Sequence, residues 1–291
     1  MACLFAARLA ASDTRVTLLG TWPEGLQALN RCGVRVLASD GSEQSYPVRA
    51  TADPAECAGA RLALVLVKSW QTERAARQLA ACLSPDGLAL TLQNGLGNRE
   101  KLAEILGVPR VALGVTTIGA TLVGPGCVRP GGEGIVSLGA NPRLDPLANL
   151  LWRAGFAVET VPDADGLLWS KLVINAAINP LTALLHVSNG ELLVRPAARM
   201  LMAEAAREAA AVAMALNMHL VFSDSVAAVE AVAQRTAINH SSMFQDVTRG
   251  APTEIDAICG AIAAEGERCQ VPTPVNRTLW LLVKALRREG S

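Results

Sequence analysis

Residues 61–95, RLALVLVKSWQTERAARQLAACLSPDGLALTLQNG, contain two apolar runs separated by a stretch with helical spacing. The runs RLALVLVK (61–68) and GLALTLQNG (87–95) are short, rich in Val and Leu, and end at polar or glycine positions. Such runs are typical of parallel strands covered on both faces, and residues 70–83 between them have the periodicity of a helix. The segment therefore predicts a strand, a helix and a second, parallel strand.

The same alternation continues on both sides of this segment. RVTLLG (15–20) and RVALGVTTIGA (110–120) are strand-like, and LFAARLAA (4–11) is helix-like. Strands that alternate with helices predict a doubly wound α/β domain. Residues 121–139 are rich in turn glycines and predict an antiparallel hairpin region instead.

After FAVETVP (156–162) the pattern changes to helical periodicity alone. The predicted helices cover residues 169–185, 196–216, the region around 224–236, 253–269 and 276–288. We therefore expect an α/β domain over residues 1–162 and an all-helical domain over residues 163–291.

Composition excludes several classes of protein. Of the 291 residues, 51% are hydrophobic and 18% charged, so the chain can bury a large core. Lys plus Arg and Asp plus Glu are 26 each, and without a long basic run a nucleic-acid partner is not expected. The seven cysteines are scattered without a C-x-x-C pair and there are three histidines, which argues against a metal site or disulfides. We expect a cytoplasmic protein that does not span a membrane, because no uncharged run reaches about 18 residues.

A polar stripe interrupts the apolar helix predicted at 169–185. Lys171, Asn175, Asn179 and Thr182 follow at steps of four, four and three, so they share one helical face. A lysine that snorkels from a half-buried helix would explain the stripe, and so would a helix that lines a polar cleft. Lys68 and Asn94 close two of the predicted parallel strands, where open α/β sheets bind their ligands.

A dinucleotide-binding fold should open with a strand and a G-x-G-x-x-G loop before its first helix. This chain opens with MACLFAARLAASDTRVTLLG, which has the pattern of a helix followed by the second strand. Either about ten residues of such a unit are missing through a misplaced start, or the protein lacks the usual pyrophosphate cradle. We favour the first explanation, because a sheet without its central strand would expose edges and apolar faces. The 291-residue form is expected to bind a nucleotide poorly.

Several longer motifs together resemble the ketopantoate reductase (2-dehydropantoate 2-reductase) family. They are LFAARL, VKSWQ, QNGLGN, TTIGA, SKLVINAAINPLTAL, SNGEL, NHSSMFQDVTRGAPTEID and VPTPVNRTL, and they span nearly the whole chain. The resemblance implies an N-terminal Rossmann domain and a C-terminal helical domain of the 6-phosphogluconate dehydrogenase type, which serves substrate binding and dimerisation. It also implies NADPH-dependent reduction of 2-dehydropantoate to (R)-pantoate, a step toward pantothenate and coenzyme A.

The resemblance assigns roles by motif position. Lys171 matches the proton donor, and the matches to substrate-binding residues are Asn175, Asn179, Asn189, Asn239, His240, Ser241 and Ser242. Lys68, Asn94, Ala120 and Glu254 match positions that face the cofactor. No metal ligand is implied.

These roles make chemical sense independently of the family. Reduction of a ketone builds negative charge on its oxygen, which an ammonium group can neutralise while donating a proton. Neutral amides on the next turns can bind hydroxyl and carboxylate groups, and a carboxylate such as Glu254, if close, would keep the lysine charged.

Alternatives remain open at this point. Thr21 stands where the family often has an arginine for the 2′-phosphate of NADPH, so NADH is an alternative cofactor. The substrate could be another branched 2-oxo acid. Two further hypotheses are a non-catalytic nucleotide-binding or sensing protein and a structural oligomer, and a homodimer is compatible with each interpretation.

Overall fold

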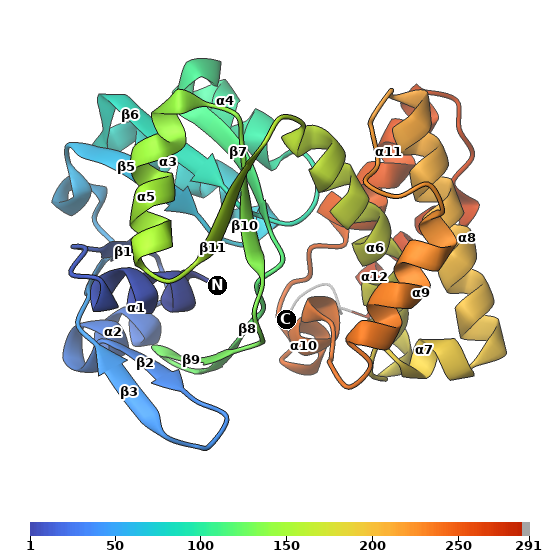
Figure 1. Cartoon of the computed structure of the whole chain (residues 1–291), viewed down its shortest axis with the longest axis horizontal. Coiled ribbons are helices and arrows are strands. Elements are labelled where there is room, and N and C mark those ends of the chain that lie inside the picture. The colour runs from blue at the N-terminus through green and yellow to red at the C-terminus, as the bar shows by residue number, and fades with distance from the viewer. Residues whose placement is uncertain (287–291) are drawn as a thin grey trace. The chain divides into compact units, whose positions relative to one another are not determined.

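The computed structural model describes residues 1–286, which form two compact units (Figure 1). Unit 1 comprises Met1–Gln93 and Asn98–Ala164, and unit 2 comprises Asn94–Gly97 and the chain from Asp165 onward. Residues 287 and 288 of the last predicted helix lie outside the described residues.

Unit 1 is built on a five-stranded sheet in the order β11-β10-β7-β6-β5. Its strands are β5 (Ala60–Val65), β6 (Leu83–Thr91), β7 (Val111–Thr116), β10 (Ile135–Gly139) and β11 (Ala157–Val161). As predicted, β5, β6 and β7 are parallel neighbours. Strand β11 is parallel to β10, a pairing that was not predicted. The sheet core is apolar on both faces, with Leu88 and Leu90 of β6 almost fully buried on one face and Ala89 on the other.

Five helices accompany the strands of unit 1: α1 (Ala2–Ala11), α2 (Pro23–Cys32), α3 (Thr72–Cys82), α4 (Asn98–Leu106) and α5 (Asp145–Arg153). Helix α3 packs against β5 and α4, and α1 packs against α5. Phe5 of α1 stacks on Phe156, with ring centroids 4.4 Å apart. Four short 3₁₀ turns complete the unit: η1 (Pro54–Cys57), η2 (Ser69–Gln71), η3 (Val108–Arg110) and η4 (Pro142–Leu144).

Two smaller sheets complete unit 1. Strands β1 (Thr17–Leu19) and β4 (Arg49–Thr51) are a parallel pair. The other sheet has the order β3-β2-β9-β8, from β3 (Glu43–Tyr46), β2 (Val34–Leu37), β9 (Cys127–Pro130) and β8 (Ala120–Gly124). Strands β2, β3 and β4 were not predicted from the sequence, because they are only three or four residues long, and β3 is also largely exposed.

The predicted hairpin region at 121–139 is only partly a hairpin. Strands β8 and β9 pair in antiparallel fashion, but β10 leaves them and joins β7 antiparallel in the large sheet. Val136 and Leu138 of β10 are buried, so this strand gains a core face there. In the described chain, α1 is the first element of regular structure.

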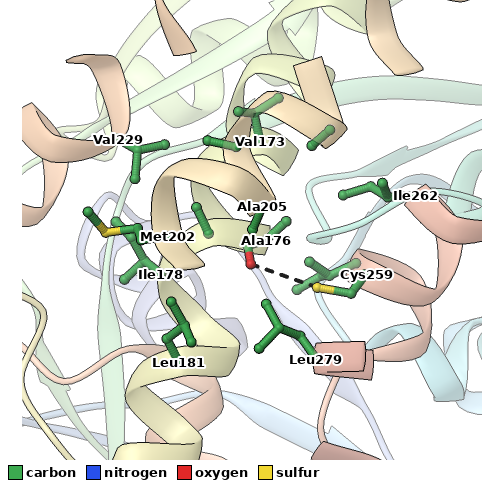
Figure 2. Packing of buried hydrophobic residues seen from close by; sticks show 14 of the residues in the cluster. Val173, Ala176, Ile178, Leu181, Met202, Ala205, Val229, Cys259, Ile262 and Leu279 are labelled. Carbon is green, nitrogen blue, oxygen red and sulfur yellow. Dashed lines mark hydrogen bonds between the residues drawn. The ribbon is translucent and has the colours of Figure 1, made fainter. Parts of the chain in front are cut away.

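Unit 2 is entirely helical, as predicted. It contains α6 (Ala164–Leu185), α7 (Glu191–Val194), α8 (Pro196–Ala215), α9 (Ser225–Arg235), α10 (Ser242–Thr248), the π-helix η5 (Asp256–Gly260), α11 (Ala261–Arg268) and α12 (Pro274–Ala285). One hydrophobic cluster holds these helices together, and alanines at its centre, such as Ala176 and Ala205, give it small side chains to pack (Figure 2).

Helix α6 contains Pro180 in its interior. Proline has no backbone N–H, so the carbonyl of Ala176, four residues earlier, loses its helical partner. The Cys259 thiol donates to this carbonyl at 3.8 Å, as Figure 2 shows. Burial raises the pKa of the Cys259 thiol, which keeps the donor proton in place.

By length and composition, α6 is also the one helix among residues 1–286 that could cross a membrane. However, 72% of its apolar window is buried within the protein. It packs as a core helix of unit 2, which accounts for its apolar composition.

Candidate functional site

The polar stripe of α6 runs along a helix whose other faces are buried. Lys171 and Asn175 keep part of their surface exposed, whereas Asn179 and Thr182 are buried. The residues between them on the helix, among them Leu172 and Val173, belong to the core of unit 2. The stripe is therefore not an ordinary solvated helix face, and each of its polar groups needs a hydrogen-bond or charge partner.

Lys171 has unusual electrostatics. Burial lowers the pKa of the Lys171 ammonium from 10.5 to about 8, and the carboxylate of Glu254 acts in the opposite direction, raising it. Glu254 is itself only 5% exposed. A lysine with a pKa near neutrality can both donate and recover a proton, which an ordinary surface lysine does less readily.

The turn Asn94–Gly97 belongs to unit 2 and docks beside Glu254. Asn94 Nδ2 donates to Glu254 Oε2 at 3.4 Å, and the Leu96 N–H donates to the Ala257 carbonyl at 2.9 Å. Gly95 between them has a φ of 82°, and a Cβ there would lie 2.5 Å from the Ala257 oxygen. A glycine is thus required at position 95, and the structure brings together Asn94, Glu254 and, through its charge, Lys171.

The motif Asn239–Ser242 lies before and at the start of α10. Ser241 is the N-cap residue, and its Oγ accepts from the Phe244 N–H at 3.1 Å. Thr182 Oγ1 of the stripe and Ser241 Oγ are hydrogen-bonded at 2.7 Å. Asn239, His240 and Ser242 are exposed. The structure therefore joins Ser241 to the stripe and leaves its three neighbours with exposed side chains.

His240 also takes part in an aromatic contact. Its ring stacks on Phe244 with centroids 4.4 Å apart, and His186 approaches the same phenyl ring edge-on at 5.7 Å.

Asn189 is only 8% exposed. Its Nδ2 donates to Thr236 Oγ1 at 2.9 Å, while its Oδ1 is enclosed without a hydrogen-bond partner. Sequence analysis had not singled out Thr236, which lies just after α9 and carries no motif of its own.

In unit 1, Lys68 follows β5 and precedes the 3₁₀ turn η2. A buried network fixes this region: Gln93 Nε2 donates to the Val67 carbonyl at 2.9 Å and to Thr72 Oγ1 at 2.8 Å. Thr72 Oγ1 in turn donates to Asn98 Oδ1 at 2.8 Å. Gln93, Thr72 and Asn98 were missed as supporting residues, although Gln93 and Asn98 lie within the QNGLGN motif.

The remaining predicted cofactor positions lie in unit 1. Ala120 is the first residue of β8, and Thr21 is exposed just after β1. Within residues 1–286, no group of three His, Cys, Asp or Glu side chains could hold a metal ion.

The family profiles of known proteins match this chain in two parts. The profile described as ketopantoate reductase PanE/ApbA matches residues 1–143, and the profile of its C-terminal domain matches residues 163–287. The chain belongs to the ketopantoate reductase family. The family predicted from the motifs is thereby confirmed.

Individual relatives agree with this membership. The chain is similar to a 2-dehydropantoate 2-reductase of Halobacterium salinarum, with 36% identity over 97% of this chain and 94% of the relative. A crystal structure of a PanE/ApbA family ketopantoate reductase from Ralstonia eutropha JMP134 superposes with a TM-score of 0.90 at 32% identity, covering 97% of this chain and 93% of the other.

A second solved structure resembles this chain in fold and is named for a different substrate. The ternary structure of D-mandelate dehydrogenase with NADH and anilino(oxo)acetate has a TM-score of 0.90 at 26% identity, covering 97% of this chain and 94% of that one. These neighbours confirm the predicted fold class, an α/β domain followed by a helical one.

Proposed function

We propose that this protein is a nicotinamide-dependent oxidoreductase that reduces 2-dehydropantoate to (R)-pantoate, a step toward pantothenate and coenzyme A. The observation that carries the proposal is the electrostatic influence of the buried Glu254 carboxylate on Lys171, which raises a pKa that burial lowers to about 8. Both residues belong to a chain whose curated relatives are named for that reaction.

Lys171 is the proposed general acid. In its ammonium form it stabilises negative charge that develops on the ketone oxygen and then donates the proton to that oxygen. Glu254 favours the charged form of Lys171, so the general acid is protonated at neutral pH. With a pKa of about 8, the amine can be reprotonated from solvent after each turnover.

The neutral amides of the stripe are the proposed substrate ligands. Asn175 and Asn179 follow Lys171 by one and two helical turns, so they can hydrogen-bond the carboxylate and hydroxyl of a 2-oxo acid while leaving the lysine as the charged group. The proposal extends to the other predicted substrate residues, Asn189, Asn239, His240, Ser241 and Ser242.

For the cofactor we propose NADPH, held through Lys68, Asn94, Ala120 and Glu254. Two observations support the fit. Lys68 provides a cation at the carboxyl end of a parallel strand, and the buried Gln93 network holds the loop that carries it. When bound, the cofactor supplies a hydride to the carbonyl carbon.

NADH is the alternative cofactor, favoured by a specific residue and by one neighbour. Thr21 cannot form the ion pair with a 2′-phosphate that an arginine at that position would offer. The D-mandelate dehydrogenase structure is described with NADH. Because that neighbour is named for a different substrate, another 2-oxo acid is the alternative substrate for this chain.

Thr21→Arg tests the role of this position. We expect the ratio of kcat/KM with NADPH to that with NADH to rise at least about tenfold, the value of one added charge-assisted contact to phosphate. Steady-state kinetics with both cofactors measure the ratio. Arg15→Ala, at an exposed position before β1, serves as the control for a general change in surface charge.

The reaction itself is tested with a panel of 2-oxo acids. Oxidation of NADPH or NADH is followed with 2-dehydropantoate, with 3,3-dimethyl-2-oxobutanoate, which lacks its hydroxyl, and with phenylglyoxylate. We expect 2-dehydropantoate to have the highest kcat/KM and to give (R)-pantoate. A higher value for phenylglyoxylate would transfer the assignment to another 2-oxo acid. No turnover with any of the three at saturating cofactor would refute it.

The proposal also covers the location of the enzyme in the cell, its partners and its oligomeric state. We propose a cytoplasmic enzyme whose partner is a small 2-oxo acid, with neither nucleic acid nor membrane among its partners. The helical domain, with its boundary near residue 163, is the proposed surface for a homodimer.

A further inference from the structure

The loop of residues 236–241, between α9 and α10, has little side-chain burial to hold it in place. Ile238 is 91% exposed, and Asn239 and His240 are also exposed. Ordering such a loop costs backbone conformational entropy. Its conformation must therefore be held by hydrogen bonds to other elements.

Four hydrogen bonds from α6 and from the turn that follows it do this. The Asn189 N–H donates to the Asn239 carbonyl and the Gly190 N–H donates to the Ala237 carbonyl, each at 3.0 Å. Asn189 Nδ2 donates to Thr236 Oγ1 at 2.9 Å, and Thr182 Oγ1 is hydrogen-bonded to Ser241 Oγ at 2.7 Å. The bonds hold the loop at its beginning, middle and end.

Close packing reinforces the contact at Gly190. A Cβ on Gly190 would lie 2.6 Å from the Ala237 Cβ, closer than two such atoms can approach. The turn that carries Asn189 therefore lies directly against the loop.

Thr236 determines how the Asn189 amide is oriented. The Thr236 hydroxyl donates to the Val232 carbonyl at 2.8 Å, so its oxygen is left as an acceptor for the Asn189 NH₂ group. The remaining amide oxygen is enclosed. In this arrangement the Asn189 NH₂ group is used by the loop, and the amide oxygen is the acceptor that has no partner among residues 1–286.

We propose that Thr236 is a positioning residue for the 2-oxo acid: with Asn189 and Thr182 it anchors residues 236–241, so that Asn239 and Ser242 are held ready to bind the substrate. The inference rests on the proposed function for its kinetic consequence. Asn189 and Ser241 belong to this anchor and keep their proposed role toward substrate. Asn239 and Ser242, both exposed, are the groups whose position the anchor fixes.

The test compares three variants. Thr236→Val keeps the side-chain shape but removes the acceptor, and Thr236→Ser keeps the hydroxyl. Thr248→Val is the matched control, because the Thr248 hydroxyl donates to the Phe244 carbonyl four residues earlier and makes the same local bond at an exposed position of α10.

In Thr236→Val we expect the KM for the 2-oxo acid to rise about tenfold, the equivalent of one lost buried hydrogen bond, with kcat and the KM for the cofactor close to wild type. Thr236→Ser should restore the KM, and Thr248→Val should not change it. A folded Thr236→Val with a normal KM, or an equal rise in Thr248→Val, would overturn the inference. So would a fall in kcat alone.

Amide hydrogen exchange tests the anchor without catalysis. In Thr236→Val, the backbone amides of Asn189 and Gly190 should exchange faster than in wild type, and in Thr236→Ser they should not. Unchanged exchange would overturn the inference even if the enzyme is active. Wild-type protein that turns over no 2-oxo acid would refute the proposed function, while the exchange result would still decide whether Thr236 holds the loop.

Discussion

At the scale of the residue, the account depends on two opposing effects on Lys171. Burial disfavours the ammonium and Glu254 favours it, and the pKa that results is about 8. Because burial is the larger effect, the folded state binds this proton less tightly than the unfolded state. Lys171 therefore lowers stability at neutral pH, and this cost is relieved as pH rises from about 8 toward 10.5. A partly exposed cation whose desolvation costs stability is expected at a site where function requires it.

Glu254→Gln tests the coupling between the two groups. Removing the carboxylate removes the influence that raises the pKa of Lys171, so that pKa should fall below its wild-type value of about 8. In the wild-type enzyme kcat/KM should decline as pH rises through about 8, because the general acid is lost there. In Glu254→Gln the same decline should begin at lower pH.

The pH dependence of kcat/KM measures this shift. Glu265→Gln is a suitable control, since Glu265 pairs with Arg268 near the surface of the same unit. An alkaline limb at the same pH in wild type and Glu254→Gln would show that the two groups are not coupled in the working enzyme.

Asn175→Ala should act differently from any change at the lysine. A neutral amide that binds the ground and transition states alike contributes to KM more than to kcat. We expect the KM for the 2-oxo acid to rise about tenfold with kcat nearly unchanged, as for the loss of one substrate hydrogen bond. Steady-state kinetics would contradict this role if kcat fell and KM did not.

At the scale of the element, the proline inside α6 creates one of the contacts that hold this helix in unit 2. Pro180 deprives the Ala176 carbonyl of a helical N–H, and the Cys259 thiol replaces it (Figure 2). Cys259 belongs to the π-helix η5, which begins two residues after Glu254. The bond therefore ties the helix that carries Lys171 to the segment that follows Glu254.

Cys259→Ala should leave the Ala176 carbonyl unpaired and create a small cavity. We expect the free energy of unfolding to fall by about 1–3 kcal/mol. Pro180→Ala should offset part of this loss in the double variant, because an alanine at position 180 can donate its N–H to the same carbonyl. Denaturant unfolding of the single and double variants measures the coupling, and strictly additive effects would argue against it.

Sequence periodicity predicted the long elements and missed several of the short ones. The strands β5, β6 and β7 and the long helices of unit 2 were predicted because each buries a continuous apolar run or stripe. Strands β2 to β4 are three or four residues long, and their pairing is set by contacts distant in sequence. The exit of β10 from the predicted hairpin region has the same cause, since its partner β7 lies outside that region.

Much of the candidate site could also be proposed from the sequence. The spacing of Lys171, Asn175 and Asn179 indicates one helix face, and the motif around Glu254 indicates its role. The partners that support these residues could not be predicted. Thr236 is an unremarkable threonine after a helix, and its contact with Asn189 joins residues 47 positions apart in the chain.

At the scale of the whole molecule, the two units carry different parts of the proposed chemistry. Unit 1 supplies the parallel strands and Lys68, while unit 2 holds Lys171, Glu254 and the turn Asn94–Gly97. The QNGLGN motif spans both, because Gln93 and Asn98 belong to unit 1 and the four residues between them to unit 2. This one motif thus links the network behind Lys68 with the contact to Glu254.

The central claim is that Lys171 donates the proton in reduction of 2-dehydropantoate, and the kcat of Lys171→Ala tests it most directly. Proton donation and charge stabilisation are each worth about two or more orders of magnitude in rate, so kcat should fall at least about a hundredfold, with a smaller effect on cofactor affinity. Lys101→Ala, at an exposed position on α4, should keep wild-type kinetics. Circular dichroism would confirm that both variants are folded. A folded Lys171→Ala enzyme with unchanged kcat would contradict the account.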